Sequence, residues 1–464
     1  RVLFRSGSIG EDMHGCVVRY NPDGSYDMGF ANSGKLIFSY GGDVSQAKDM
    51  ALQPDGKILV TGFSDNGPTY NMATYRFLEN GITDLDFGVG GVATTDFGHD
   101  EYASAVTIQD DGKILVTGHV IYGPGADIDM FVCRYTTDGS VDLSFGTNGH
   151  VLTDLNVESE DMPGDITMHM NKILVSAYAY DGNSSDYDAV ALAQYDLNGV
   201  LDPNFGSSGI SLFQGITISN FWLSAGTSMA LDAYNRVVVA SQVIGIESTD
   251  FAMFRFAENG IPDNTFGDYG LVITDMTDDN AAYSAAIQPD GKILAGGYHI
   301  NGGYFDHCIV RYLENGDLDT DFGVDGISNI NLTQNMTDDV AYSLALQTNG
   351  YLIAAGMATN DDYNRDFSVA RIHTGLPTGI HEQNNNNTGF TIQPNPTNGI
   401  FSIETTIPLS EIKSIMLYDL SGKVVYQEEQ VSGFGFNLDF LNGGVYMLAL
   451  KHQEGICFQK IIIE

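Results

Sequence analysis

The sequence predicts an all-β protein in which a ring of short strands is followed by a small β-sandwich. Three observations predict this fold class: a motif that returns about every 58 residues, a tight turn in each copy, and a change of pattern near residue 375. The composition agrees, because 54 Gly, 24 Tyr and 25 Phe residues favour short strands joined by turns. A chain of 464 residues is long enough for two or more domains.

One strand type defines the repeat. It reads Gly-Cys-Val-Val-Arg-Tyr at residues 15–20 and Met-Ala-Thr-Tyr-Arg-Phe at residues 72–77. The basic position of this strand, which is Gln in one copy, recurs at Arg19, Arg76, Arg134, Gln194, Arg255, Arg311 and Arg371. Such regular spacing indicates a tandem array over residues 7–374. Because the Arg recurs in most copies, we expect it to bond to an Asp of its own blade or to a neighbouring turn.

The remaining parts of each copy follow in a fixed order. An Asn-Gly or Asp-Gly pair such as Asn80-Gly81 comes next and tolerates the positive φ of a tight turn. A loop with a Phe-Gly pair follows, and we expect its Phe to anchor the loop on the core, as at Phe87, Phe145, Phe205, Phe266 and Phe322. A short strand such as residues 91–96 is next, and a hairpin such as residues 51–60 completes the copy.

Four short strands per copy are typical of a β-propeller blade. The motifs resemble the delta-60 repeat family, and this resemblance implies a propeller-like fold. The third and fourth copies depart most, with Asn171-Lys172 and Asn235-Arg236 where others have Asp-Gly-Lys. A solenoid of strands is the alternative architecture, but closure into a ring leaves fewer exposed strand edges.

The strand count predicts the number of blades. With the hairpin strands named a and b, the Arg strand c and the short strand d, the chain reads c, d, five complete sets, then a, b and c. Seven blades close if an upstream segment of about 40 residues supplies one d, one a and one b strand. The N-terminal blade is therefore expected to be incomplete, and residues 1–6 are expected not to be native sequence. Six blades with one redundant c strand is the alternative.

The last 75 or so residues carry a different pattern. Apolar runs alternate with turn signals and predict a small antiparallel sandwich over residues 390–464, after an Asn-rich linker at 375–389. This segment resembles the type A C-terminal sorting domain of the type IX secretion system of Bacteroidota. The residues that carry the resemblance are Pro394, Asn395, Pro396, Gly399, Asp419, Gly422, Gly444, Tyr446 and Lys460.

The resemblance implies a route and a place for the protein. It implies recognition of the tail by the type IX secretion machinery and by a sorting protease. It also implies a secreted protein or one on the exterior of the bacterial outer membrane, and an export signal upstream of the repeats. We expect no transmembrane segment, because no stretch of 18 apolar residues occurs.

Charge and cysteines limit the chemistry further. The chain has 60 acidic and 20 basic residues, a net charge of −40, which disfavours nucleic acid and anionic membranes as partners. Cys16, Cys133, Cys308 and Cys457 form no Cys-x-x-Cys pair and are predicted to be buried thiols.

Motifs of catalysis are absent from the sequence, including Gly-x-Ser-x-Gly, His-Glu-x-x-His and the Walker loop. The only cofactor that the sequence suggests is calcium, because Asp278, Asp279, Asp338 and Asp339 lie in equivalent acidic loops. Solvated turns closed by local Asx hydrogen bonds are the alternative explanation of these loops.

The sequence thus favours a non-enzymatic binding or adhesion protein, with a glycan or a surface protein as its ligand. A secreted polysaccharide-degrading enzyme is one alternative, because propellers gather catalytic residues from separate blades. A purely structural surface protein is the other.

Overall fold

The computed structural model describes most of the chain as two compact units, and each is treated by itself below. The described residues are 7–9, 12–39, 45–65, 67, 69–123, 128–155, 160–180, 189–213, 222–244, 248–332, 337–360, 364–375, 390–405, 407–418, 424–428, 431, 433–441, 443–452 and 455–463. The first unit comprises residues 1–345 and 353–371, and the second comprises residues 346–352 and 372–464.

The described residues of the repeat array form seven sets of strands in six sheets, because one parallel bridge between Ile128 and Glu160 joins two of the sets. The first set contains β1 (Gly7–Ile9), β2 (Asp12–Val18) and β3 (Lys35–Phe38). Five sets of four strands follow, of which the second and third share the eight-stranded sheet: β4 (Ser45–Leu52), β5 (Ile58–Asp65), β6 (Tyr70–Phe77) and β7 (Val92–Thr95); β8 (Asp100–Ile108), β9 (Ile114–Ile121), β10 (Ile128–Tyr135) and β11 (His150–Thr153); β12 (Glu160–His169), β13 (Lys172–Tyr180), β14 (Ala189–Tyr195) and β15 (Ile210–Phe213); β16 (Trp222–Leu231), β17 (Val237–Ile244), β18 (Thr249–Phe256) and β19 (Leu271–Thr274); β20 (Asn280–Ile287), β21 (Ile293–Asn301), β22 (Tyr304–Tyr312) and β23 (Ile327–Ile330). The last contains β24 (Asp339–Leu346), β25 (Tyr351–Thr359) and β26 (Arg365–His373).

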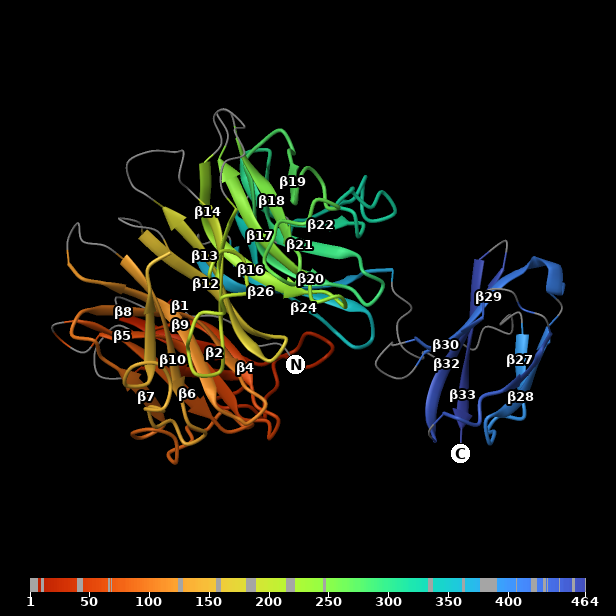
Figure 1. Cartoon of the computed structure of the whole chain (residues 1–464), viewed down its shortest axis with the longest axis horizontal. Coiled ribbons are helices and arrows are strands. Elements are labelled where there is room, and N and C mark those ends of the chain that lie inside the picture. Colours follow the sequence, from red (N-terminus) through yellow and green to blue (C-terminus); the bar gives the residue numbers. More distant parts are fainter. Residues whose placement is uncertain are drawn as a thin grey trace. The chain divides into compact units, whose positions relative to one another are not determined.

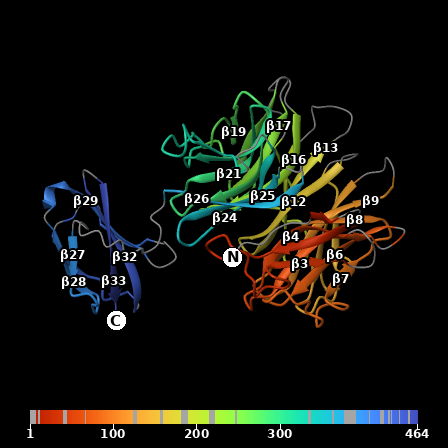
Figure 2. The same ribbon diagram turned by 180° about the vertical axis from the view of Figure 1, so that it is seen from behind.

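These sets of strands are the blades of a β-propeller, as the sequence predicted. The colours of Figures 1 and 2 pass from sheet to sheet around a centre, and β24 lies beside the N-terminal strands in both views. Hydrophobic clusters join neighbouring blades; one contains Leu59 and Met72 from one blade with Val116 and Phe131 from the next. The strand sequence matches the predicted order except for β1, which pairs with β2 in the place of a b strand.

A β-bulge interrupts strand a in five blades, for example between Ala47 and Asp49. Glycine stands opposite this bulge in three of the five blades, at Gly62, Gly118 and Gly297, where no side chain fits. A Cβ on Gly62 would lie 1.8 Å from the Gln46 carbonyl oxygen, and one on Gly297 would lie 1.7 Å from that of Ala281. The bulge turns its extra residue toward the centre of the ring, where strand a lies.

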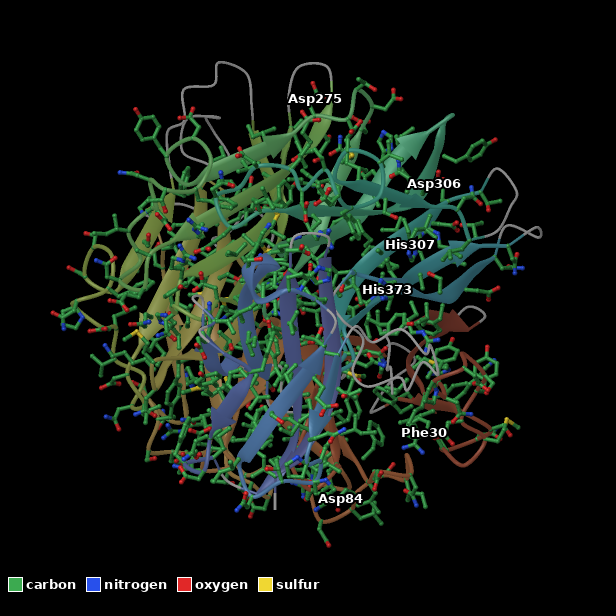
Figure 3. All side chains as sticks on the ribbon, turned by 90° about the vertical axis from the view of Figure 1, so that its right-hand side faces the viewer. Phe30, Asp84, Asp275, Asp306, His307 and His373 are labelled. Atoms are coloured by element: carbon green, nitrogen blue, oxygen red, sulfur yellow. The ribbon has the colours of Figure 1, made fainter. Side chains whose placement is uncertain are left out.

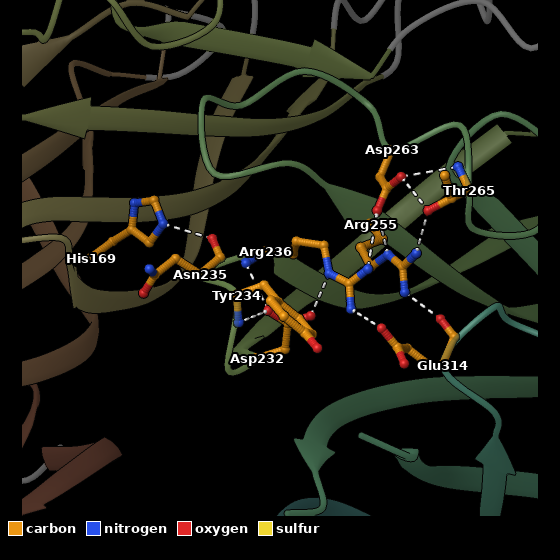
Figure 4. Close-up of polar contacts among 9 residues, drawn as sticks. All are labelled: His169, Asp232, Tyr234, Asn235, Arg236, Arg255, Asp263, Thr265 and Glu314. Atoms are coloured by element: carbon orange, nitrogen blue, oxygen red, sulfur yellow. Dashed lines mark hydrogen bonds and ion pairs between the residues drawn. The ribbon is translucent and has the colours of Figure 1, made fainter. Parts of the chain in front are cut away.

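Buried arginines connect the blades. Arg76 is 5% exposed, its Nε lies 2.8 Å from Asp84 Oδ2 in the same blade, and its Nη1 donates to the Thr137 carbonyl of the next blade. Its guanidinium also stacks 4.4 Å from the centre of the Phe87 ring. We call this arrangement the arginine bridge, and it confirms the role that the sequence predicted for this Arg and Phe. Figure 4 shows the same arrangement for Arg255 with Asp263, Thr265 and the Glu314 carbonyl.

The third complete blade has Gln194 instead of Arg and bridges to the next blade differently. The Gln194 amide lies 2.7 Å from His169 Nδ1, and His169 Nε2 lies 2.8 Å from the Asn235 carbonyl oxygen of the fourth blade. Lys172 pairs with Asp202 as Lys57 pairs with Asp84, so this contact belongs to the repeat. The link from Gln194 through His169 to the Asn235 carbonyl takes the place of the arginine bridge, and its His169–Asn235 contact appears in Figure 4.

The last blade meets the first through the same geometry. Arg371 Nη1 donates to the Pro22 carbonyl at 2.7 Å, and Pro22 stands three residues after Arg19, as Thr137 stands three residues after Arg134. The last and first sheets are therefore related as neighbouring blades are. This contact and the seven sets of antiparallel strands support the predicted count of seven blades, which stays a prediction.

The tail forms the sandwich that the sequence predicted. One sheet has the order β27 (Phe390–Gln393), β28 (Ile400–Thr405), β31 (Gly435–Asn437), and a short 3-10 helix, η1 (Leu409–Glu411), follows β28. The other has the order β30 (Val424–Glu428), β29 (Ile412–Tyr418), β32 (Gly444–His452), β33 (Gly455–Ile463). Their facing side chains, such as Ile403, Leu417, Leu448 and Ile461, form one core. The greater part of the predicted linker, residues 376–389, lies outside the described residues.

Candidate functional site

A cavity of about 450 Å³ occupies the centre of the propeller. Strand a of each of six blades lines it with the residue that follows the bulge, or with that residue's counterpart in β24: Asp49, Ala105, Asp165, Ser228, Ser284 and Ser343. The first sheet instead contributes Cys16 and Val17 from β2. We call this cavity the central channel.

Two carboxylates face the central channel. Asp49 Oδ2 accepts a hydrogen bond of 2.8 Å from the Val106 N–H of the next blade. Asp165 Oδ2 accepts one of 2.9 Å from the Met229 N–H of the next blade, and its Oδ1 accepts one of 2.8 Å from Ile166. Both side chains therefore fasten one inner strand to the following one as well as lining the cavity.

Both carboxyl groups are held partly protonated near neutral pH. Burial raises the pKa of Asp49 to about 6, although hydrogen bonds from Val106 and Met50 oppose the shift. Burial and then the charge of Asp49 raise the pKa of Asp165 to about 7. The channel can therefore both accept and donate hydrogen bonds through these groups.

Two aromatic side chains line the channel. The rings of Tyr283 and Tyr342, at equivalent positions of neighbouring blades, lie 5.3 Å apart. Elsewhere in the ring Tyr102 stacks on His119 at 5.2 Å and meets Phe63 at 4.8 Å. The two tyrosines at the bulge positions, which line the cavity, are half-buried and offer ring surface to a ligand.

Histidines near the channel are neutral at physiological pH. Burial, followed by the charge of Lys48, lowers the pKa of His119 to about 4. Burial likewise lowers the pKa of His307 to about 4, and its Nε2 lies 3.1 Å from Ser368 Oγ of the last blade. Figure 3 shows His307 next to Asp306 on β22. These rings pack and hydrogen-bond within the propeller.

The predicted calcium ligands lie where strand a begins. Asp279 accepts the Thr249 N–H at 2.8 Å and Asp338 accepts the Phe305 N–H at 3.2 Å, each from the preceding blade. The buried Asp339 accepts the Leu332 N–H at 2.8 Å, and the Asp278 carbonyl accepts the Asn280 side-chain amide. Within the described residues no group of three or more His, Cys, Asp or Glu side chains could hold a metal ion. Calcium binding in these loops stays a prediction.

The residues of the predicted sorting motif differ in their contacts and burial in the sandwich. Asn395 Oδ1 accepts the Ile462 N–H at 2.9 Å, and Gly399 has φ +93° with no room for a Cβ beside Asp439. Tyr446 is buried in the core, whereas Pro394, Pro396 and Gly444 are exposed. Asp419, Gly422 and the side chain of Lys460 lie outside the described part of the chain.

The sequence interpretation missed Asp49 and Asp165. Both occupy one position of the repeat, two residues after the Ala or Pro that precedes the bulge, where other copies have Ala or Ser. Aligning the copies along strand a would have shown two acidic residues at an otherwise small position. The three described thiols, Cys16, Cys133 and Cys308, are free and buried, as predicted.

Comparison with known families agrees with this architecture. Residues 53–87, 109–145 and 288–322 match the "Domain of unknown function (DUF5122) beta-propeller", so the repeat array is a β-propeller. Residues 391–464 match the "Secretion system C-terminal sorting domain". The chain is thus a β-propeller protein that carries a type IX sorting domain, and this domain indicates a secreted or cell-surface protein. No helix in the described residues is long and apolar enough to cross a membrane.

Solved structures resemble the chain only distantly. Sqt1 from Chaetomium thermophilum has 11% identity and a TM-score of 0.38, with 90% of this chain and 96% of that chain covered. An α-L-arabinanase from Penicillium chrysogenum has 11% identity and a TM-score of 0.43, with coverage of 70% and 92%. An ulvan lyase of family PL25 has 13% identity and a TM-score of 0.42, with coverage of 78% and 87%. These likenesses say nothing of ligand or activity, and no curated protein matches the chain.

Proposed function

We propose that this is a non-enzymatic binding protein that works outside the cell or on its surface and holds a carbohydrate at the entrance of the central channel. The sorting domain supports the location. The channel supports the ligand class, because sugars present apolar ring faces to aromatic side chains and hydroxyls to carboxylates and serines.

The observation that carries the proposal is the combination of Tyr283 and Tyr342 with hydroxyl and carboxyl groups around one cavity. The rings lie at two neighbouring bulge positions, and Ser284, Ser343 and Asp165 line the same cavity. The sheets hold these groups rigidly, so little conformational entropy is lost when a ligand binds. In this proposal a glycan on another cell or in the matrix is the partner, and the sorting protease and the secretion machinery act on the tail.

A second candidate is a polysaccharide-degrading enzyme. The observation in its favour is the raised pKa of Asp165, about 7, next to the charge of Asp49, since a glycosidase needs one protonated and one ionised carboxyl group. Against it, both oxygens of Asp165 already accept backbone hydrogen bonds. A structural protein without a small ligand is the third candidate.

A glycan array combined with product analysis separates these candidates. We expect the purified chain to bind a defined glycan without cleaving it, and we expect Tyr283→Ala to reduce binding at least about fivefold, since stacking contributes on the order of 1 kcal/mol or more. Tyr234→Ala is the matched control, because Tyr234 is 67% exposed in the turn between β16 and β17 and does not line the cavity. Sugar products that disappear in Asp165→Asn would establish the enzyme, and absence of binding and cleavage would leave the structural protein.

A further inference from the structure

The two carboxyl groups of the central channel differ from the other buried carboxylates of the ring. In the arginine bridge, Asp84 Oδ2 lies 2.8 Å from Arg76 Nε and 3.1 Å from Lys57 Nζ, so two cations compensate its charge. Two further blades have the same pair of cations, at Asp142 and Asp319. For Asp49 and Asp165, only backbone N–H groups among the described residues lower the pKa, and no cationic side chain does. These two groups therefore face the cavity without a cation of their own.

Fastening the blades to each other does not require a carboxylate at this position. Ser284 occupies the same position of strand a in a later blade, and its Oγ accepts the Leu344 N–H of the following blade at 3.0 Å. Asp49 and Asp165 accept the equivalent N–H of the blade that follows each of them. A hydroxyl group thus makes the same bond between blades, and burial of a charged group costs more than burial of a hydroxyl. The acidic side chains therefore indicate a ligand rather than a structural need.

The remaining lining of the channel also suits a cation. Tyr283 and Tyr342 line the cavity with rings 5.3 Å apart, and aromatic ring faces attract positive charge. Lys48 is the one Lys or Arg among the described residues of the lining, and its Nζ already lies 5.7 Å from the centre of the Phe63 ring in its own blade. The net charge of −40 raises the local concentration of cationic ligands further. A positively charged ligand therefore meets carboxyl groups and aromatic rings in one cavity.

We propose that the sugar in the central channel carries a free amino group, and that Asp49 and Asp165 bind this group as an ammonium ion. This assignment rests on the proposed function and narrows its carbohydrate to an amino sugar that is not N-acetylated. An ammonium group has three donors, and each carboxylate keeps lone pairs beside its backbone hydrogen bonds. Such charge-assisted hydrogen bonds are stronger than neutral ones. Because N-acetylation removes the charge, the site distinguishes free amines from amides.

Calorimetric titration of the purified full chain at pH 7 tests this specificity. The probes are oligomers of glucosamine and of galactosamine, each as the free amine and as the N-acetylated form of the same length. The two forms of each oligomer differ only at the nitrogen. We expect a free-amine oligomer to bind at least about tenfold more tightly than its N-acetylated form, the effect of hydrogen bonds to a charged group.

Replacement of both carboxylates by serine tests their part in this preference. In a double variant with Asp49→Ser and Asp165→Ser, the two forms of the oligomer should bind equally well. Serine keeps the bond between blades, as Ser284 does, so circular dichroism and Tm should show a folded ring. Asp110→Ser is the matched control, because Asp110 is exposed in the turn between β8 and β9 and does not line the cavity. It should keep the full preference.

Two results overturn the amino-sugar ligand and leave the proposed function in place. One is an N-acetylated or neutral glycan that binds as tightly as every free-amine oligomer. The other is a double variant that keeps the preference for the free amine. Absence of binding by all glycans of the array, in contrast, overturns the amino-sugar ligand and the proposed function together.

Discussion

Removing one arginine bridge should cost the propeller several kcal/mol. Arg134 is 4% exposed, and its Nε lies 2.8 Å from Asp142 Oδ2. Its other nitrogens donate to Ser144 Oγ at 3.2 Å and to the Leu197 carbonyl of the next blade, and its guanidinium lies 4.7 Å from the centre of the Phe145 ring. Arg134→Ala removes all of these contacts at once.

The loss in free energy of unfolding depends on the buried charge that Arg134→Ala leaves without its partner. Breaking a buried ion pair usually costs about 3–5 kcal/mol because the partner charge stays buried. Lys113 lies 3.0 Å from the same Asp142 oxygen and still compensates part of the charge, so about 3 kcal/mol applies here. The lost bond to Leu197 adds about 1 kcal/mol. A ring of roughly 370 residues unfolds with an entropy of about 0.8 kcal/mol/K, so about 4 kcal/mol lowers Tm by about 5 °C.

Thermal unfolding followed by circular dichroism measures this effect, and urea titration supplies the free energy of unfolding. The matched control is Arg371→Ala, because Arg371 is exposed and donates to the Pro22 carbonyl at 2.7 Å. Loss of a solvent-accessible hydrogen bond should cost about 1 kcal/mol and lower Tm by only about 1 °C. If Arg134→Ala unfolds within 1 °C of the wild type, or no earlier than Arg371→Ala, the arginine bridge does not hold the blades together.

Three further predictions concern pH, calcium and export. The folded pKa of Asp165, about 7, lies above its ordinary value of 3.8, so its contribution to stability is complete at low pH and is lost as pH rises through 7. Asp165→Asn should therefore raise Tm at pH 8 and leave Tm unchanged near pH 4. Equal effects on Tm at both pH values would contradict this. Millimolar Ca²⁺ should leave Tm unchanged, because Asp279 and Asp338 already accept backbone N–H groups; an increase that Asp279→Asn removes would instead establish the calcium site. Deleting residues 388–464 should retain the protein in the periplasm, and normal export of the truncated protein would show that the tail is dispensable.

The sequence was enough to predict the fold because its repeats are local. Short-range chemistry predicts the Asn-Gly turns, the alternating hairpins and the loop anchored by Phe87 or its equivalent. In the repeat array β1 was missed, since residues 7–9 carry no apolar alternation and are a strand only through pairing with β2. The arginine bridge was anticipated as a bond to an Asp or a turn, but its reach into the next blade depends on tertiary geometry.

The candidate site was harder to predict for a physical reason. A channel residue is defined by the bulge that turns it inward, and in so short a strand the bulge only shifts the alternation by one residue. Asp49 and Asp165 therefore looked like ordinary polar residues of a strand. The acidic loops drew attention instead because Asp278 and Asp279 are adjacent in sequence, although Asp279 is occupied in fastening one blade to another.

Departures from the repeat distinguish structure from function in this ring. Gln194 departs from Arg, but His169 departs with it and restores the connection between blades, so that departure is structural. The bulge position behaves differently: it holds Lys48 in one blade, Ser104 in the next and tyrosines at 283 and 342, all lining one cavity. Repetition of the framework with side chains that differ among the blades gives a symmetric ring an asymmetric interior. An asymmetric ligand fits such an interior when it stacks on Tyr283 and Tyr342 while its polar groups face Asp165.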